Sequence, residues 1–139
     1  MTKAISLLEV EKVAFYLARE RLSFDEAIPD FATRFPYVLE SCLAVPFQRF
    51  AQKSLYPDLP SQAAILFYLL IKDHPFQNGN KRIAITTLLY FLYKNQKWLQ
   101  ADTKKLYNFA VWVAESLTEL KADTLSAANR FIKKYLVDL

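Results

Sequence analysis

The sequence predicts an all-α protein that folds as one compact helical bundle. The chain of 139 residues contains one glycine and six prolines, and 53% of its residues are hydrophobic. So few glycines are atypical of a chain rich in tight β-turns, and this share of apolar residues can fill a sizeable core. Apolar residues also recur at helical spacing over most of the length. We therefore expect residues 1–139 to form a single domain.

The first predicted helix begins after Ser6 and runs to about Leu22. Ser6 and Glu9 have the spacing of a capping box, in which each side chain bonds the backbone of the other residue. Helical spacing then continues through a set of four apolar residues, which are Leu7, Val10, Ala14 and Leu17.

The next segment is predicted to be shorter and more broken. Ser23 and Glu26 repeat the capping-box spacing, but Pro29 prevents a long helix there, so the chain to Phe35 is expected to be a turn or a helical fragment. A helix is then predicted from Pro36 to Val45, because proline is favoured in the first turn and Pro46 stops the helix.

The segment from Phe47 to Pro60 is the least regular part of the sequence. It contains several polar residues and no clear helical or strand period. A loop of this length in so compact a chain is more often functional than idle, although an ordinary surface connection remains the alternative.

Two helices without a polar face are predicted to form the centre of the bundle as an antiparallel pair. Ser61–Lys72 is apolar nearly all round, and so is the helix that follows Arg82 and ends at Lys94–Lys97. Two amphipathic helices then complete the chain. One is capped near Asp102, and the other starts near Thr124. Their inward residues are predicted to be Leu106, Phe109, Val113 and Leu117 in the first, and Leu125, Ala128, Ile132 and Tyr135 in the second.

Composition also limits the compartment and the partners. Cys42 is the only cysteine, which excludes an intramolecular disulfide and a C-x-x-C site. The N-terminus lacks a signal-peptide pattern, and the longest apolar run, Ala63–Ile71, is about half of the roughly 20 residues that span a bilayer. We therefore expect a cytoplasmic protein with no membrane partner. The net charge is +4, but its basic residues are scattered, which is typical of a solvated surface.

The stretch His74–Arg82, which joins the two central helices, contains the only histidine and the only glycine of the chain. Histidine titrates near neutral pH and can act as a proton acceptor at the mouth of a loop. Glycine adopts positive φ without steric cost and allows a close approach of the backbone. Two cations, Lys81 and Arg82, follow Gly79 in the first helical turn, where they oppose the helix dipole unless an anion binds between them. These residues together predict a phosphate site.

Each residue of this stretch has a predicted role. His74 is the candidate general base, with a helix-capping histidine as the alternative. Phe76 is expected to point inward as an anchor. Backbone amides around Gly79, Asn80 and Lys81 can form an anion nest, to which the Asn80 amide adds a donor. Arg82 offers a planar fork for two phosphate oxygens, and Lys81 offers a point charge.

At these residues the chain resembles the Fic/Doc family, whose signature is His-x-Phe-x-Asp/Glu-Gly/Ala-Asn-Gly/Lys-Arg. Eight of the nine positions fit. The match is closer to the Doc (death-on-curing) toxin branch, because Lys81 stands where Fic adenylyltransferases have a second glycine, and Ile85 where they have a second arginine. The exception is Asn78, which occupies the position of the metal-binding acid.

The resemblance implies a Fic/Doc-like helical domain with transferase activity. A Doc-like kinase moves the terminal phosphate of ATP or another nucleoside triphosphate, with Mg²⁺, onto a Ser, Thr or Tyr hydroxyl of a target protein. A translation elongation factor is the expected target. A Fic-type enzyme instead transfers AMP (AMPylation). The family also implies a small antitoxin as partner, since the chain contains no Ser/Thr-x-x-x-Glu-Gly/Asn inhibitory motif, and a flap that docks the target, matching Phe47–Pro60.

Two further hypotheses remain open. An amide at Asn78 brings a dipole without a charge to the metal position, so the chain can be a catalytically impaired member that binds a nucleotide or a partner. Asp73 is the nearest carboxylate in sequence, but it need not face the same way. A basic nucleic-acid-binding module is the weaker hypothesis, because no helix has the clustered Lys and Arg of a recognition helix.

Overall fold

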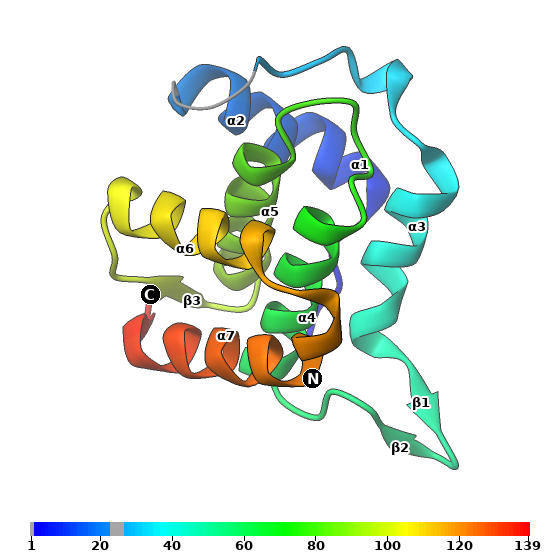
Figure 1. Cartoon of the computed structure of the whole chain (residues 1–139), viewed down its shortest axis with the longest axis vertical. Helices are drawn as coiled ribbons and strands as arrows, with labels where there is room; N and C mark the ends of the chain where they lie inside the picture. The colour runs from blue at the N-terminus through cyan, green and yellow to red at the C-terminus, as the bar shows by residue number, and fades with distance from the viewer. Residues whose placement is uncertain (1, 23–26) are drawn as a thin grey trace.

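Two antiparallel helices occupy the centre of the computed structural model, which describes residues 2–22 and 27–139. These are α4 (Leu59–Lys72) and α5 (Asn80–Lys94), shown in green in Figure 1. Every residue from Gln62 to Ile71 is buried, as is most of α5. The predicted helical bundle with a central pair is therefore confirmed.

The N-terminal helix is interrupted by one wider turn. It consists of α1 (Leu7–Glu9), the π-helical turn η1 (Val10–Ala14) and α2 (Phe15–Arg21). The predicted capping box is present. The π turn inserts a residue into the helical repeat, so that Phe15 and Ala18 are buried while Leu17 is only half-buried. The N-terminal helix also bonds the central pair, because the hydroxyl of Thr86 in α5 donates to the Ala14 carbonyl (2.7 Å).

The chain then passes around the bundle in short pieces. The 3-10 turn η2 (Phe31–Thr33) is the predicted helical fragment, and α3 (Pro36–Ala44) has Pro36 at its first position, as expected. A second 3-10 turn, η3 (Val45–Phe47), follows. The predicted capping box at Ser23 and Glu26 lies outside the described residues.

The segment predicted to be an irregular loop contains a β-hairpin. Strands β1 (Arg49–Phe50) and β2 (Lys53–Ser54) pair antiparallel around Ala51 and Gln52. Both turn residues have positive φ, of 51° and 65°, which matches the twist of a two-residue hairpin. The hairpin projects from the N-terminal end of α4, at the opposite end from the α4–α5 loop (Figure 1).

The C-terminal part covers one face of the central pair. It contains β3 (Lys97–Leu99), α6 (Thr103–Glu115), the 3-10 turn η4 (Thr118–Leu120), α7 (Lys121–Tyr135) and β4 (Leu136–Asp138). Asp102 caps α6 by accepting from the Lys105 N–H (2.7 Å), as predicted. Leu117 is 60% exposed; its predicted inward position is wrong because α6 already ends at Glu115. The pairing of β3 with β4 was not predicted.

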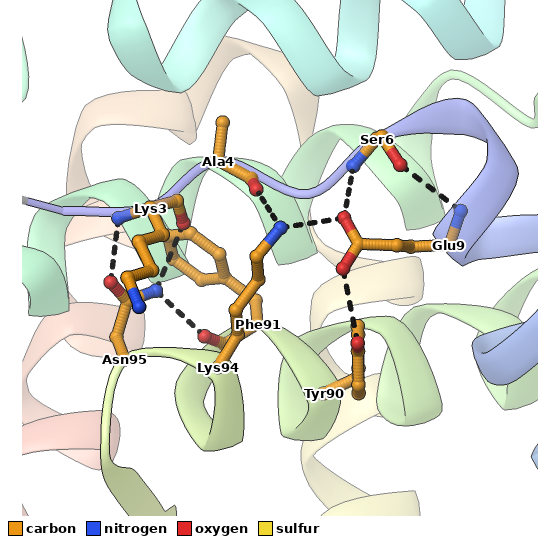
Figure 2. A network of polar contacts seen from close by, with 8 residues as sticks. All are labelled: Lys3, Ala4, Ser6, Glu9, Tyr90, Phe91, Lys94 and Asn95. Carbon is orange, nitrogen blue, oxygen red and sulfur yellow. Dashed lines mark hydrogen bonds and ion pairs between the residues drawn. The ribbon is translucent and has the colours of Figure 1, made fainter.

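A polar cluster fastens the N-terminal segment to the C-terminal end of α5 (Figure 2). Lys94 Nζ contacts Glu9 Oε1 at 2.7 Å, and the Tyr90 hydroxyl donates to Glu9 Oε2 at 3.0 Å. The Asn95 amide bonds both the N–H and the carbonyl of Lys3. We call these four side chains, together with the Lys3 backbone, the N-terminal clasp. Partial burial alone would raise the pKa of Glu9, but the bonds from Lys94, Ser6 and Tyr90 lower it to about 2.

Over residues 2–22 and 27–139, none of the helices is both long and apolar enough to cross a membrane.

Candidate active site

The stretch with the family signature forms the loop between α4 and α5, at one end of the central pair (Figure 1). Asp73 is the residue that follows the last turn of α4, and Gly79 is the residue that precedes the first turn of α5. Because both flanking helices are buried, the two ends of this loop, which we call the motif loop, are fixed by the core. The structure therefore gathers all the predicted site residues, from His74 to Arg82, within one connection and the first helical turn after it.

Gly79 is required for two separate reasons. Its φ of +73° lies in the left-handed region, and a Cβ there would lie 2.8 Å from Ile28 Cδ1 and 3.2 Å from the Ala27 carbonyl oxygen. The close approach is therefore to another segment of the same chain. Glycine also supplies no side-chain cap to α5. The first turn of this 15-residue helix thus keeps the electrostatic character that attracts anions.

Asn80 holds the shape of the motif loop. Its side chain is 7% exposed, accepts from the Phe76 N–H at 3.0 Å and donates to the Phe76 carbonyl at 2.9 Å. This pair of bonds closes a small ring across the loop. The predicted donation from Asn80 to a phosphate is a separate role and stays a prediction.

Phe76 lies under the loop with 1% of its surface exposed. Its ring centroid is 5.4 Å from Phe15 of α2 and 6.1 Å from Phe31 of η2, and these two rings are 5.2 Å apart in an edge-to-face arrangement. Buried aromatic pairs of this geometry each contribute about 0.5–1.5 kcal/mol beyond their buried area. The three rings tie the motif loop to the N-terminal third of the chain.

His74 is exposed at the mouth of the loop and has a strained backbone. Its φ is +51°, a conformation that costs a non-glycine residue about 1–3 kcal/mol and that concentrates at functional sites. The next residue is fixed, since the Pro75 carbonyl accepts from the Phe35 N–H at 2.9 Å. Sequence reasoning missed this strain because residue type alone does not reveal φ.

Arg82 is turned inward, towards α2. Its side chain is 7% exposed, and Nη2 donates to the carbonyls of Ala18 (2.6 Å) and Leu22. These acceptors lie at the C-terminal end of α2, where helical carbonyls lack partners within the helix. Arg82 therefore has a structural role that the sequence did not reveal, and its predicted contact with phosphate stays a prediction. Lys81, the other predicted phosphate ligand, is half-buried.

The predicted metal position offers one amide. Asn78 is exposed, and so is Asp73 at the other end of the loop. Throughout the part of the chain that the structure describes, no three His, Cys, Asp or Glu residues are grouped so that they could hold a metal ion. The donor set thus does not fit a resident metal site. Mg²⁺ also binds proteins through few ligands when nucleotide phosphates supply the others.

A segment that sequence reasoning overlooked lies over the motif loop. Residues 27–35 contact it at three points: Ile28 against Gly79, Phe31 against Phe76, and the Phe35 N–H on Pro75. Figure 1 shows this segment passing above the loop. The hairpin expected to dock a target beside the site is separated from the loop by the whole of α4, about 21 Å at 1.5 Å per residue. The expected position of the flap is therefore wrong for this structure.

A model of a known protein family matches more than half of the chain. The model of the Fic/DOC family matches residues 9–92, which include most of the N-terminal helix, the whole motif loop and most of α5. No curated protein and no solved structure matches the chain. Members of this family are typically transferases. With more than half of its length matched and the signature loop in place between its two central helices, the chain belongs to the Fic/DOC family.

Proposed function

We propose that this protein is a Doc-like phosphotransferase that moves the terminal phosphate of a nucleoside triphosphate onto a hydroxyl of a target protein. The observation that carries the proposal is His74, an exposed imidazole on a strained backbone at the mouth of a loop fixed at both ends. The backbone that carries this imidazole is held in place by the core, and the imidazole itself is accessible to an incoming side chain. Proton transfer by a positioned base contributes about 10²–10⁴ to a rate.

In the proposed step the neutral His74 imidazole takes the proton of a Ser, Thr or Tyr hydroxyl of the target. The hydroxyl oxygen attacks the γ-phosphorus, and a new P–O bond forms. The bond between the γ-phosphorus and the bridging oxygen breaks, and the nucleoside diphosphate leaves with that electron pair. The products are a phosphorylated side chain and the diphosphate, while His74 returns its proton to solvent.

The N-terminus of α5 is the proposed phosphate site. Gly79, Asn80 and Lys81 bring backbone N–H groups to the positive end of the helix dipole, and Lys81 and Arg82 add two charges. Mg²⁺ is proposed to enter with the nucleotide as part of the substrate, because the donor set around Asn78 is too small for a resident ion. When bound, the ion would neutralise phosphate charge.

Two residues favour phosphate transfer over AMP transfer. Lys81 replaces the second glycine of Fic adenylyltransferases, and Ile85 replaces their second arginine. Ile85 is 1% exposed in the core, so that position cannot reach a phosphate. A translation elongation factor as target, and a small antitoxin as partner, are proposed from the same likeness to the Doc branch.

The test is a transfer assay in a cell lysate with ATP labelled at either the α or the γ phosphate. We expect label from the γ position to reach protein, and His74→Ala to abolish it with the fold intact. Label from the α position would overturn phosphate transfer in favour of AMPylation. Label from neither position, with MgATP still bound, would overturn the enzyme proposal.

A catalytically impaired member is the second candidate, and two observations favour it. Asn78 supplies no charge at the metal position, and the Arg82 fork already donates to two backbone carbonyls of α2 and its C-cap. In this alternative the chain binds a nucleotide or a partner without transferring a group. Equilibrium binding of MgATP without turnover would distinguish it from the active enzyme.

A further inference from the structure

Helices α6 and α7 leave an apolar groove between them, far along the chain from the motif loop. Its volume is about 380 Å³. Six residues line it, which are Lys105, Asn108, Phe109, Trp112, Ala127 and Phe131. Figure 1 shows the two helices side by side on one face of the bundle.

The floor of the groove is a stack of nearly parallel aromatic rings. The rings of Phe109 and Phe131 are 3.9 Å apart and 13° from parallel, and Phe67 of α4 stacks on Phe109 at 5.0 Å. Phe109 is 7% exposed, whereas Trp112, at 6.4 Å from it, is 47% exposed. The floor is thus anchored to the core, and a large apolar edge is open to solvent. Exposed apolar surface of this kind marks interaction sites.

Charge is distributed unevenly along the groove. The two helices contain six basic and two acidic residues, so their net charge equals the +4 of the whole chain. Lys105 and Lys134 lie 5.1 and 5.4 Å from the Tyr135 ring, which packs on Phe131. Glu115 and Asp123 belong to the opposite ends of α6 and α7. One end of the groove is therefore basic.

The family match does not account for this face. It ends at residue 92, before α6 begins at Thr103. The groove is also separate from the motif loop, none of whose residues line it. The proposed transfer reaction therefore explains neither the exposed Trp112 nor the basic end of the groove.

We propose that the groove binds a segment of a partner protein that places apolar side chains between α6 and α7 and carries carboxylates at the Lys105–Lys134 end. Apolar anchors in a groove supply affinity, and charges at its rim set orientation and partner choice. Single-stranded nucleic acid fits less well, because successive bases need several exposed ring faces. Here Phe109 is covered by its neighbours, and Trp112 alone among the stacked rings is largely exposed.

The test is selection of peptides from a random display library against the full chain. We expect enriched peptides to combine aromatic or aliphatic residues with Asp or Glu clustered at one end. Trp112→Ala should abolish their binding, and Lys105→Glu, which reverses the charge of the lysine that lines the groove, should weaken it at least about tenfold. Lys104→Glu is the matched control: it makes the same charge change at the adjacent, exposed position, outside the groove lining, and should change affinity less than about twofold.

Four results would overturn the proposal. They are a library without enrichment, enriched peptides that are basic, equal losses with Lys104→Glu and Lys105→Glu, and peptide binding that survives Trp112→Ala. Circular dichroism of each variant excludes unfolding as the cause. Two further measurements can reassign the face. Tighter binding of a single-stranded oligonucleotide would assign it to nucleic acid, and Trp112-dependent dimerisation in sedimentation would assign it to a second copy of the chain.

Discussion

The two ends of α5 both bond distant parts of the chain, but they differ in what else they present. At the C-terminal end, Lys94 and Tyr90 bond Glu9, and Asn95 bonds the Lys3 backbone, in the clasp of Figure 2. At the N-terminal end, Arg82 also bonds a distant segment, the C-terminal end of α2, but Gly79 supplies no side-chain cap and the loop before it exposes His74 on a strained backbone. Both ends therefore fasten α5 to the N-terminal part of the chain, and the N-terminal end also adjoins an exposed histidine.

This difference indicates that the clasp serves stability, whereas the motif loop serves the proposed function. The clasp lowers the pKa of Glu9, which is a direct sign that its charged form is stabilised by the fold. Strain at the motif loop is instead offset by the buried rings of Phe15, Phe31 and Phe76. Changes at the clasp should therefore alter stability alone, while changes at the loop should separate activity from stability.

The largest effect is expected from His74→Ala. Loss of the base should reduce transfer by about 10²–10⁴, with the melting temperature nearly unchanged, because the side chain is exposed. His74→Gly should also lack activity but melt slightly higher, since glycine relieves the positive φ. A rate assay with γ-labelled ATP and a thermal melt check both. Unfolding of His74→Ala would show instead that the imidazole is a structural cap.

Gly79→Ala tests the strained junction of the motif loop with α5. We expect it to destabilise the fold by about 2–4 kcal/mol, through positive φ and overpacking, because the new Cβ would lie 2.8 Å from Ile28 Cδ1. Denaturant unfolding measures this cost. The double variant with Ile28→Ala should recover the part due to Ile28 Cδ1, but not the 3.2 Å contact with the Ala27 carbonyl oxygen or the conformational part. Equal stability of Gly79→Ala and the parent would contradict the contact with residues 27 and 28.

The clasp can be broken with acid. The pKa of Glu9 is lowered from 4.5 to about 2, so its contribution is complete above about pH 4.5 and is lost as the pH falls towards 2. Because both partners of the ion pair are about a quarter exposed, we expect a contribution of only about 1–2 kcal/mol. Glu9→Gln should remove that part of the acid dependence of unfolding. Glu20→Gln, at an exposed position of α2, is the matched control and should leave it in place.

The sequence was sufficient where a local rule decides the structure. Ser6 with Glu9, Asp102, and Pro36 gave helix starts that the structure contains, because capping depends on residues a few positions apart. The apolar runs around Ile65 and Leu88 likewise gave the buried central pair. His74 and Gly79 could be singled out because they are neighbours along the chain.

Features that have no local sequence signal, or that are set by distant parts of the chain, were missed. The π turn near Ala14 shifts the buried face of the N-terminal helix, and the Ala51–Gln52 turn lacks the glycine or asparagine that usually signals a hairpin. The partners of Arg82 are about 60 residues away in sequence, at Ala18 and Leu22. No local pattern around Arg82 indicates them, so its structural role emerged only from the fold.

The smallest expected effect on the fold comes from Asn78→Asp, which tests how the motif loop binds the metal ion that enters with the nucleotide. The two side chains have nearly the same shape and position 78 is exposed, so the free energy of unfolding should change by less than about 0.5 kcal/mol. A carboxylate beside the triphosphate should, however, lower the Mg²⁺ concentration needed for half-maximal activity, because Mg²⁺ binds through carboxylates and phosphates together. Titration of transfer against Mg²⁺ in both forms measures this. Activity in the aspartate form alone would identify a disabled enzyme, activity in both would mean that the amide suffices, and an absence of MgATP binding in both would remove the phosphate site from the loop.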